Sequence, residues 1–408
     1  MIAELLREEV HRCNKCGACI GSCQVYKQLN YESASPRGKV QLIKRLLAGE
    51  LELSEKMNRI LFTCLLCESC TVTCPSGVQV DRLMKAVRSE LFREYGGGWQ
   101  KRGLFKLLAS NRLLSLAMFF GRAVEDTVRS MLGADAALGT LAIRSLPRLN
   151  RKPLRDQFPE VVTVERPKGR VVYFTGCATN YLCENVGRSV ITVLNRVGIE
   201  VVIPKDQMCC SLPIFLSGAR ELAITNIGKN LSILNRGDVD AVIVDCATCG
   251  AALKHDYPQM LEEMGEDAEA ARSLAAKVKD ISQYLAGFDL AGLLRPLPER
   301  VTYHDPCHLL RSQRVKEEPR ALLRQIPGLE FREMAGADLC CGGGGSFQLQ
   351  HPDIASGITA RKIEAIRSSG ATMVASGCTG CRLQIKSGLR DEPVPVVHPV
   401  ELLARALR

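Results

Sequence analysis

Four ordered cysteine clusters constrain this chain more than any other feature of its sequence. Two clusters near the N-terminus each place four cysteines within 11 residues. Two later clusters each combine a single cysteine, an adjacent Cys-Cys pair and a Cys-x2-Cys motif. The members are Cys13, Cys16, Cys19 and Cys23; Cys64, Cys67, Cys70 and Cys74; Cys177, Cys209, Cys210, Cys246 and Cys249; and Cys307, Cys340, Cys341, Cys378 and Cys381. Only Cys183 stands outside them.

This cysteine usage indicates metal binding rather than a disulfide framework. The chain has 19 cysteines in 408 residues, below the share of roughly 8–10% that is typical of disulfide scaffolds. Its hydrophobic content of 46% is enough for the cores of several domains. Residues 1–12 hold three glutamates and no apolar run, so we expect no signal peptide and a cytoplasmic, reducing compartment. In that compartment, dense thiolates favour a soft metal.

The two N-terminal clusters match the bacterial ferredoxin run Cys-x2-Cys-x2-Cys-x3-Cys-Pro, although Gln24 replaces the proline after Cys23. In that run the fourth cysteine binds the other cluster of the pair. The resemblance therefore implies two [4Fe-4S] clusters. The implied ligands are Cys13, Cys16, Cys19 and Cys74 for cluster 1, and Cys64, Cys67, Cys70 and Cys23 for cluster 2. Structural zinc is the alternative, but zinc motifs pair one Cys-x2-Cys with a distant second one.

The two later clusters lie in the two copies of a duplicated domain. Cys177 and Cys307 are 130 residues apart, and Cys249 and Cys381 are 132 apart. The amino-acid sequence that leads into each cluster also repeats, as RVVYFTGC ending at Cys177 and RVTYHDPC ending at Cys307. Because the offset between the two copies changes by only two residues along the cluster, the sequence indicates tandem domains. In each copy, strand-like segments alternate with helical ones, which predicts a βαβαβα order, a parallel sheet and cysteines just past the strand ends. The predicted strands are 171–174, 200–203, 241–244, 302–304, 329–332 and 372–375.

The predicted fold class is therefore α+β with several domains. Residues 1–98 are expected to form a helical, ferredoxin-type domain with helices over 38–50 and 80–95. Residues 99–167 are expected to be a basic linker containing two or three short helices. The two α/β domains are expected over 168–290 and 298–408.

The later clusters resemble the cysteine-rich "CCG" domain of heterodisulfide reductase catalytic subunits. In that family five such cysteines hold a noncubane cluster, so the resemblance implies one or two further [4Fe-4S] clusters. An adjacent cysteine pair is poorly placed to chelate one iron, but it can bridge two irons or serve two sites. Zinc, an ordinary cluster and partly vestigial cysteines remain alternatives. His304 and His308 flank Cys307 and are candidates for hydrogen bonds to cluster sulfurs.

The whole chain resembles the iron–sulfur subunit of glycolate oxidase and of related FAD-linked D-lactate dehydrogenases. The segments SPRGK at 35–39 and HPVEL at 398–402 belong to this resemblance. It implies an electron-transfer subunit of an oxidoreductase complex, without catalytic residues of its own. Its partner is an FAD-binding subunit that oxidises glycolate or D-lactate, and its acceptor is a quinone or a cytochrome. No GxGxxG follows a strand, so FAD is expected on the partner and not on this chain.

Two other functions stay open. The first function is that of a heterodisulfide reductase-like subunit that reduces a disulfide at a noncubane cluster. The second is that of an anchor-type subunit of anaerobic glycerol-3-phosphate dehydrogenase.

Residues 101–155 hold eleven Lys or Arg and three Asp or Glu among apolar residues, so we weigh membrane-surface contact against an ordinary packed linker. The longest apolar run, 113–121, has nine residues, which predicts peripheral contact at the inner face of the membrane without a span. No nucleic-acid partner is expected.

Overall fold

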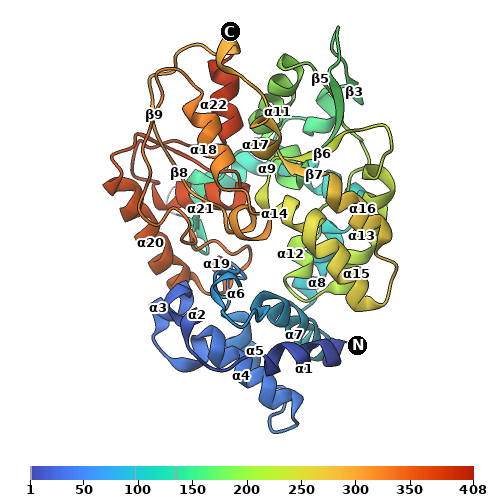
Figure 1. Ribbon diagram of the computed structural model, residues 1–408, viewed down its shortest axis with the longest axis vertical. Helices are drawn as coiled ribbons and strands as arrows, with labels where there is room; N and C mark the ends of the chain where they lie inside the picture. Colours follow the sequence, from blue (N-terminus) through green and yellow to red (C-terminus); the bar gives the residue numbers. More distant parts are fainter. Residues whose placement is uncertain (1, 97, 134–135) are drawn as a thin grey trace.

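The computed structural model describes residues 2–96, 98–133 and 136–408. Figure 1 shows an N-terminal helical region in blue beneath two α/β domains, the first in green and yellow and the second in orange and red. The α+β class is confirmed. The loop over residues 63–68 faces the second α/β domain, where residues 308–312 contact residues 66–68.

The N-terminal region consists of helices around the two cysteine loops. These are α1 (Ile2–His11), α2 (Ala18–Ser22), α3 (Gln24–Leu29), α4 (Pro36–Leu47), α5 (Glu55–Phe62), α6 (Ser69–Thr73) and α7 (Val80–Tyr95). The predicted helix over 80–95 is α7, and the one over 38–50 corresponds to α4. Helix α4 begins at Pro36 because Ser35 Oγ accepts a hydrogen bond from the Gly38 N–H at 2.9 Å.

The linker contains one helix far longer than predicted. After α8 (Trp99–Leu108), helix α9 runs over Asn111–Leu132, which is 22 residues, and a small hairpin follows in β1 (Ala137–Leu138) and β2 (Leu141–Ala142). The prediction of short helices was wrong for α9. The helix continues through Gly121, where a side chain would come within 3.3 Å of Leu149, so this glycine permits close packing rather than marking a break.

The first α/β domain has a five-stranded sheet in the order β3-β5-β4-β6-β7, in which only β3 is antiparallel to its neighbour. The strands are β3 (Val161–Val162), β4 (Gly169–Phe174), β5 (Ile199–Val202), β6 (Ala241–Val244) and β7 (Val278–Asp280). The helices are α10 (Gly176–Tyr181), α11 (Glu184–Arg196), α12 (Leu212–Phe215), α13 (Arg220–Leu234), α14 (Ala247–Ala251), α15 (Tyr257–Met264), α16 (Glu269–Lys277) and α17 (Ile281–Leu285).

The second α/β domain repeats this order in an all-parallel sheet, β11-β10-β8-β9. Its strands are β8 (Arg300–Tyr303), β9 (Glu330–Phe331), β10 (Met373–Ala375) and β11 (Val396–Val397). Its helices are α18 (Glu317–Arg324), α19 (Phe347–Gln350), α20 (Pro352–Ser368), α21 (Thr379–Gly388) and α22 (Pro399–Ala406). The sequence predicted three strands in each copy. The structure adds a fourth parallel strand to each, β7 and β11, and the first sheet also gains the antiparallel strand β3 from the predicted linker. These strands have two or three residues each, too few to produce a recognisable pattern.

The two α/β domains share one hydrophobic core. Val171, Val201 and Ile243 of the first domain belong to the same buried cluster as Val301 and Leu403 of the second. Helices α11 and α22 pack against each other within it. This shared core fixes the relative position of the two domains, and with it the relative position of their cysteine clusters.

Candidate iron–sulfur site

The two N-terminal cysteine loops have the same backbone conformation. Lys15 and Leu66, each two residues after the first cysteine, have φ values of 61° and 51°. Gly17 and Glu68, each directly after the second cysteine, have φ values of 87° and 61°. Positive φ is uncommon outside glycine, and for a bulky leucine it is a true outlier. Loops of this kind turn successive N–H groups inward and form concave anion sites.

The cysteines predicted for cluster 1 come from both loops. Burial, together with the nearby thiols of Cys13 and Cys74, raises the pKa of Cys19. Cys74 ends α6 much as Cys23 ends α2, with φ and ψ of −75° and 116° against −81° and 113°. Cys74, the last cysteine of the second loop, thereby lies near Cys19 of the first loop, and Cys23 lies near Cys64 of the second. Cys16 is exposed, so this group lies at the surface of the molecule.

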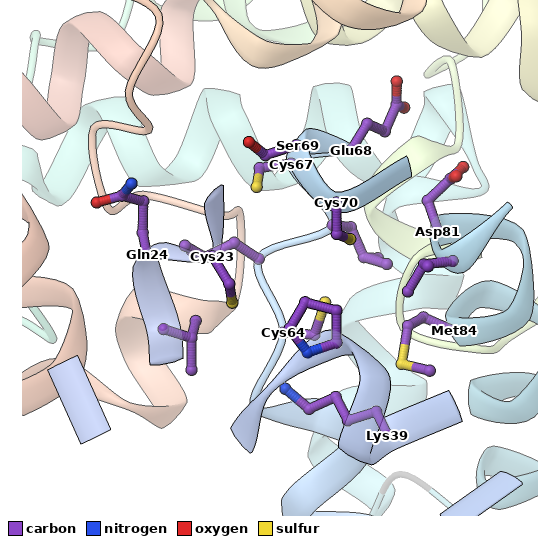
Figure 2. Close-up of a pocket in the computed structure, with 15 residues that line it drawn as sticks. Cys23, Gln24, Lys39, Cys64, Cys67, Glu68, Ser69, Cys70, Asp81 and Met84 are labelled. Carbon is purple, nitrogen blue, oxygen red and sulfur yellow. The ribbon is translucent and has the colours of Figure 1, made fainter. Parts of the chain in front are cut away.

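The four cysteines predicted for cluster 2 line one cavity. Cys23 lies near Cys64 and Cys67, and Cys70 lies near all three. Figure 2 shows their sulfurs around a hollow, with the ammonium group of Lys39 below Cys64. Lys39 is buried, and its Nζ donates hydrogen bonds to the carbonyls of Ala34, at 3.1 Å, and Thr63. Burial lowers the pKa of Lys39, while the neighbouring thiols of Cys64 and Cys23 act in the opposite direction. The cavity therefore contains a buried lysine, held by two backbone carbonyls, beside the thiols.

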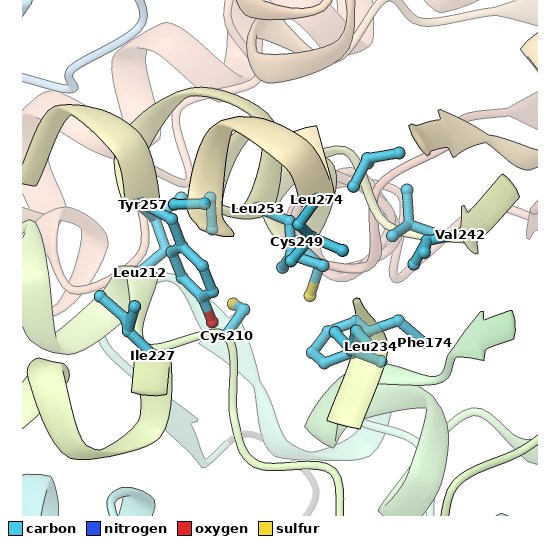
Figure 3. Packing of buried hydrophobic residues seen from close by; sticks show 14 of the residues in the cluster. Phe174, Cys210, Leu212, Ile227, Leu234, Val242, Cys249, Leu253, Tyr257 and Leu274 are labelled. Atoms are coloured by element: carbon cyan, nitrogen blue, oxygen red, sulfur yellow. The ribbon is translucent and has the colours of Figure 1, made fainter. Parts of the chain in front are cut away.

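The five cysteines of the first CCG domain form a connected row of thiols. Cys177 contacts Cys209, Cys209 is followed by Cys210, Cys210 contacts Cys249, and Cys249 contacts Cys246. Figure 3 shows Cys210 and Cys249 beside Tyr257, inside the core of the domain. The residue after the pair, Ser211, has a φ of 62°, which matches the 91° of Gly342 in the second domain. The two Cys-Cys pairs thus share a turn even though the glycine is absent from the first.

The second CCG domain has an equivalent row, with a histidine beside it. Cys307 contacts Cys340, Cys341 contacts Cys340 and Cys381, and Cys381 contacts Cys378. A ring nitrogen of His304 and the sulfurs of Cys341 and Cys381 all lie within 4.8 Å of one another. Burial lowers the pKa of His304, so the ring is neutral.

Two thiol contacts join these groups into a continuous series. Cys67 of the ferredoxin-type loop contacts Cys307, and this contact, together with burial, raises the pKa of Cys67 well above its ordinary value. Cys246 of the first CCG domain contacts Cys378 of the second, and Thr248 Oγ1 is 3.5 Å from Cys378 Sγ. The series runs from cluster 2 through the second CCG domain to the first.

The donor set is suited to iron–sulfur centres. All 19 cysteines, every one within the described part of the chain, are free thiols. Contacts with Cys340 and Cys381 lower the pKa of Cys341, and contacts with Cys246 and Cys381 lower that of Cys378, which favours the thiolate, the form that binds metal, at these two positions. Neighbouring thiols and burial raise the pKa of most other cysteines in the rows, Cys177 and Cys307 among them. Buried thiols, concave loops and a buried lysine together provide what an anionic cluster requires.

Two families of known domains match three parts of the chain. A family described as "4Fe-4S dicluster domain" matches residues 9–78, and one described as "Cysteine-rich domain" matches 171–254 and 301–386. The chain belongs to the family of iron–sulfur proteins that join a dicluster ferredoxin domain to two CCG domains. We refer below to the dicluster domain, CCG1 and CCG2.

Relatives of this family match almost the full length of the chain. The probable glycolate oxidase iron–sulfur subunit of Bacillus subtilis is 29% identical, over 98% of this chain and 94% of its own length. One subunit of the fumarate reductase (CoM/CoB) of Methanothermobacter marburgensis is 32% identical, over 98% and 73%. One subunit of the dihydromethanophenazine:CoB–CoM heterodisulfide reductase of Methanosarcina mazei is 27% identical, over 98% and 94%. These relatives are subunits of oxidoreductases.

Several residues of the site carried no usable sequence signal. His308 was a candidate for a hydrogen bond to cluster sulfur, but its Nε2 lies 3.3 Å from the carbonyl oxygen of Leu66. Arg311 donates to the Cys67 carbonyl at 3.3 Å, and Ser312 Oγ donates to the Glu68 carboxylate at 2.7 Å. These side chains fix the cluster 2 loop against CCG2. Their partners are more than 240 residues away in the chain, so no local pattern indicates them.

Proposed function

We propose that this chain is the electron-transfer subunit of a complex whose FAD subunit oxidises a 2-hydroxy acid, glycolate or D-lactate. The observation that carries the proposal is the thiol series from cluster 2 through CCG2 to CCG1, joined at Cys67–Cys307 and Cys378–Cys246, with the exposed Cys16 on the neighbouring ferredoxin-type loop. When bound, iron–sulfur centres accept and release single electrons and so divide a two-electron oxidation into one-electron steps. The chain's own part is to hold its ligand sets in order, with one end at the surface where a partner docks.

The ligand sets in this proposal are the eighteen clustered cysteines. Cluster 1 takes Cys13, Cys16, Cys19 and Cys74, and cluster 2 takes Cys23, Cys64, Cys67 and Cys70. The ten cysteines of CCG1 and CCG2 hold one or two further [4Fe-4S] clusters of noncubane type. FAD belongs to the partner subunit. Support comes from the relative in Bacillus subtilis that is named as a probable glycolate oxidase iron–sulfur subunit.

The acceptor in this proposal is a quinone reached at an anionic membrane surface through α9. This helix exposes an apolar stripe in which Phe119 is 72% and Met131 80% accessible. Leu113, Leu116, Phe120, Val124 and Val128 continue the stripe at spacings of three and four residues. Basic residues predominate in 101–155, which suits anionic headgroups. Within the described residues no single helix has the length and apolar character of a membrane span, and only a pair bent by 101°, Arg102–Leu108 with Asn111–Leu132, passes by composition.

The position of α8 and α9 suits this role because both pack on CCG1. Ser115 Oγ is 2.7 Å from the Tyr181 hydroxyl, on the helix that carries Cys177. Phe105 of α8 belongs to the same core cluster as Cys210 and Cys249. The apolar stripe therefore adjoins the end of the thiol series that is remote from Cys16. In this proposal the protein is peripheral on the inner face of the cytoplasmic membrane.

The deciding experiment is anaerobic affinity purification from the native cell, with the co-purifying chains identified and flavin assayed. We expect a stoichiometric FAD protein, and bleaching of the iron–sulfur absorbance on adding glycolate or D-lactate. Purification without flavin, together with reoxidation of the reduced protein by a disulfide, contradicts the proposal.

One observation favours a second function, the reduction of a disulfide. The cysteine rows of CCG1 and CCG2 face each other at Cys246 and Cys378. A disulfide bound between them would take up two electrons and two protons and leave as two thiols. The similarity to a heterodisulfide reductase subunit supports this alternative. The purification above separates the two functions, because only the second predicts reoxidation by a disulfide without a flavoprotein.

A further inference from the structure

The two CCG domains differ at one buried position beside their cysteines. The repeat aligns Phe174 of CCG1 with His304 of CCG2, each three residues before the first cysteine of its domain. Both side chains are fully buried, at 0% exposure. Phe174 packs in the apolar core of CCG1. His304 places a polar ring at the matching position, so a position that is apolar in CCG1 offers a ring nitrogen in CCG2.

Among the described residues, the His304 ring makes no hydrogen bond to a nitrogen or oxygen atom of the protein. Its side-chain hydrogen-bond partner is the sulfur of Cys341, the second cysteine of the adjacent pair. The nearby cation, Lys362, is engaged elsewhere, because its Nζ donates to the carbonyls of Gly336 at 2.6 Å and Ala337 at 3.2 Å. A buried imidazole is costly unless its nitrogens have partners. Among the described residues, the ring meets a sulfur of the CCG2 cysteine row and makes no hydrogen bond to any nitrogen or oxygen atom of the protein.

The surroundings of the ring indicate a metal as a partner. One ring nitrogen and the sulfurs of Cys341 and Cys381 lie within 4.8 Å of one another. Donors around one tetrahedral metal, at about 2.0–2.3 Å from it, are separated by roughly 3–4 Å. Small side-chain adjustments would bring these three donors to that separation.

We propose that His304 is a nitrogen ligand to the iron of the CCG2 centre, which is thus a mixed histidine–cysteine site, whereas the CCG1 centre is held by cysteines alone. The inference rests on the metal role proposed above for the CCG cysteines. In this assignment the imidazole takes the place of one of the five thiolates as a ligand, and exchanging a thiolate for a neutral imidazole raises the potential of an iron–sulfur centre. The CCG2 centre accordingly has the higher potential of the two, and the duplicated domains are not redox equivalents.

The test is pulsed electron paramagnetic resonance on the anaerobically purified holoprotein, poised so that each centre in turn is paramagnetic. Natural-abundance protein is compared with protein labelled with ¹⁵N-histidine. We expect the coupling of a directly bound nitrogen, altered by the label, in one CCG signal only. Absence of that coupling, or iron analysis that leaves CCG2 without iron, overturns the inference. The wild-type protein alone decides this, whatever the stability of any variant.

Two variants assign the nitrogen to its residue. His304→Phe reproduces the residue of CCG1, and we expect it to abolish the coupling and lower the potential of the same centre. His308→Gln removes the neighbouring imidazole while keeping a donor for the Leu66 carbonyl, and we expect the coupling to remain. Coupling that survives in His304→Phe contradicts the assignment. These spectra require neither the FAD partner nor a substrate, so they are independent of whether glycolate or D-lactate reduces the complex.

Discussion

The thiol of Cys67, in the loop of the dicluster domain, contacts the thiol of Cys307, the first cysteine of CCG2, although 239 residues separate them along the chain. Cys67 also lies near Cys340, the next cysteine of the CCG2 row, so this one residue of the dicluster domain faces two cysteines of CCG2. Electron exchange between the two parts of the molecule is therefore expected to depend on this one junction.

Cys67→Ala tests the junction. We expect loss of cluster 2, which is about four irons per chain, and reduction of the CCG centres at least about tenfold slower than in the wild type, because the link to them is broken. Iron analysis and stopped-flow reduction measure the two effects. Cys183→Ala is the matched control, because Cys183 lies outside the four ligand sets. This variant should contain as much iron per chain as the wild type. Unchanged iron in Cys67→Ala contradicts the ligand assignment.

The cluster 1 loop should be sensitive to a side chain at Gly17 and tolerant of one at Gly21. Gly17 has a φ of 87°, and an added Cβ would come within 2.8 Å of Arg37 Nη1. We expect Gly17→Ala to lower the free energy of unfolding by about 1–2 kcal/mol. Gly21 lies in α2 with nothing within 4 Å, so Gly21→Ala should raise it by up to about 1 kcal/mol. Anaerobic denaturant titration measures the free energy of unfolding of the two variants. If both substitutions change it by a similar amount, backbone strain at Gly17 is excluded as the cause of the destabilisation.

A buried ion pair holds the dicluster domain to CCG1. Lys85 Nζ is 2.8 Å from Asp256 Oδ1, and both side chains are buried. Burial alone would lower the pKa of Lys85. The nearby carboxylates of Asp256 and Asp81 raise the pKa by more than burial lowers it, so the net shift is upward and the lysine stays charged. Lys85→Met leaves Asp256 uncompensated, and we expect a loss of about 3–5 kcal/mol in the free energy of unfolding.

The control for this pair is the exposed one between Arg93 and Glu90. Arg93→Met should change the free energy of unfolding by less than about 0.5 kcal/mol, because exposed pairs contribute little. Equal effects of Lys85→Met and Arg93→Met contradict the domain-joining role of Lys85.

Asp280 should make stability fall as the pH rises. Its Oδ1 accepts a hydrogen bond from the Ser282 N–H at 2.8 Å, whereas its Oδ2 is buried without a hydrogen-bond partner. Burial raises the pKa of Asp280 from 3.8 to about 7. The folded state therefore holds a proton that the unfolded state has lost between these pH values, and the free energy of unfolding decreases across that window.

Asp280→Asn keeps the Oδ1 acceptor and removes the charge, so it should be more stable than the wild type at pH 8 by about 1–4 kcal/mol and nearly equal at pH 4. Thermal midpoints measured at several pH values detect this. Asp238→Asn is the control, since Arg236 lowers the pKa of Asp238 to about 2 and this group does not titrate between pH 5 and 8. A midpoint difference independent of pH contradicts the assignment to Asp280.

The apolar stripe of α9 should bind anionic vesicles. Phe119→Asp puts a charge on its most exposed aromatic residue, and we expect at least about a tenfold loss of partitioning onto phosphatidylglycerol vesicles. Leu349→Asp is the control, because Leu349 is also exposed but lies on α19, away from the stripe. Binding should weaken at high salt. Equal loss in both variants, or binding to neutral and anionic vesicles alike, contradicts the proposal.

The sequence allowed much of this architecture to be predicted where spacing is local or repeated. The run from Cys13 to Cys23 and its copy at Cys64 indicate a dicluster domain, and the 130-residue offset indicates the duplicated sheet. The fourth strands were missed because β11 has only two residues and depends on its neighbours for order. The contact of Cys67 with Cys307 and the pairing of Lys85 with Asp256 depend on how domains pack, which no local pattern records.

The exposure of Cys16, contrasted with the burial of Cys209, Cys340 and their neighbours, has a consequence for survival in air. In the proposed complex, the surface that the partner protein reaches first is also the surface that dioxygen reaches first. Oxidative damage should therefore begin at cluster 1 and proceed inward, so that an air-exposed chain loses its connection to the partner while its deeper centres are still intact.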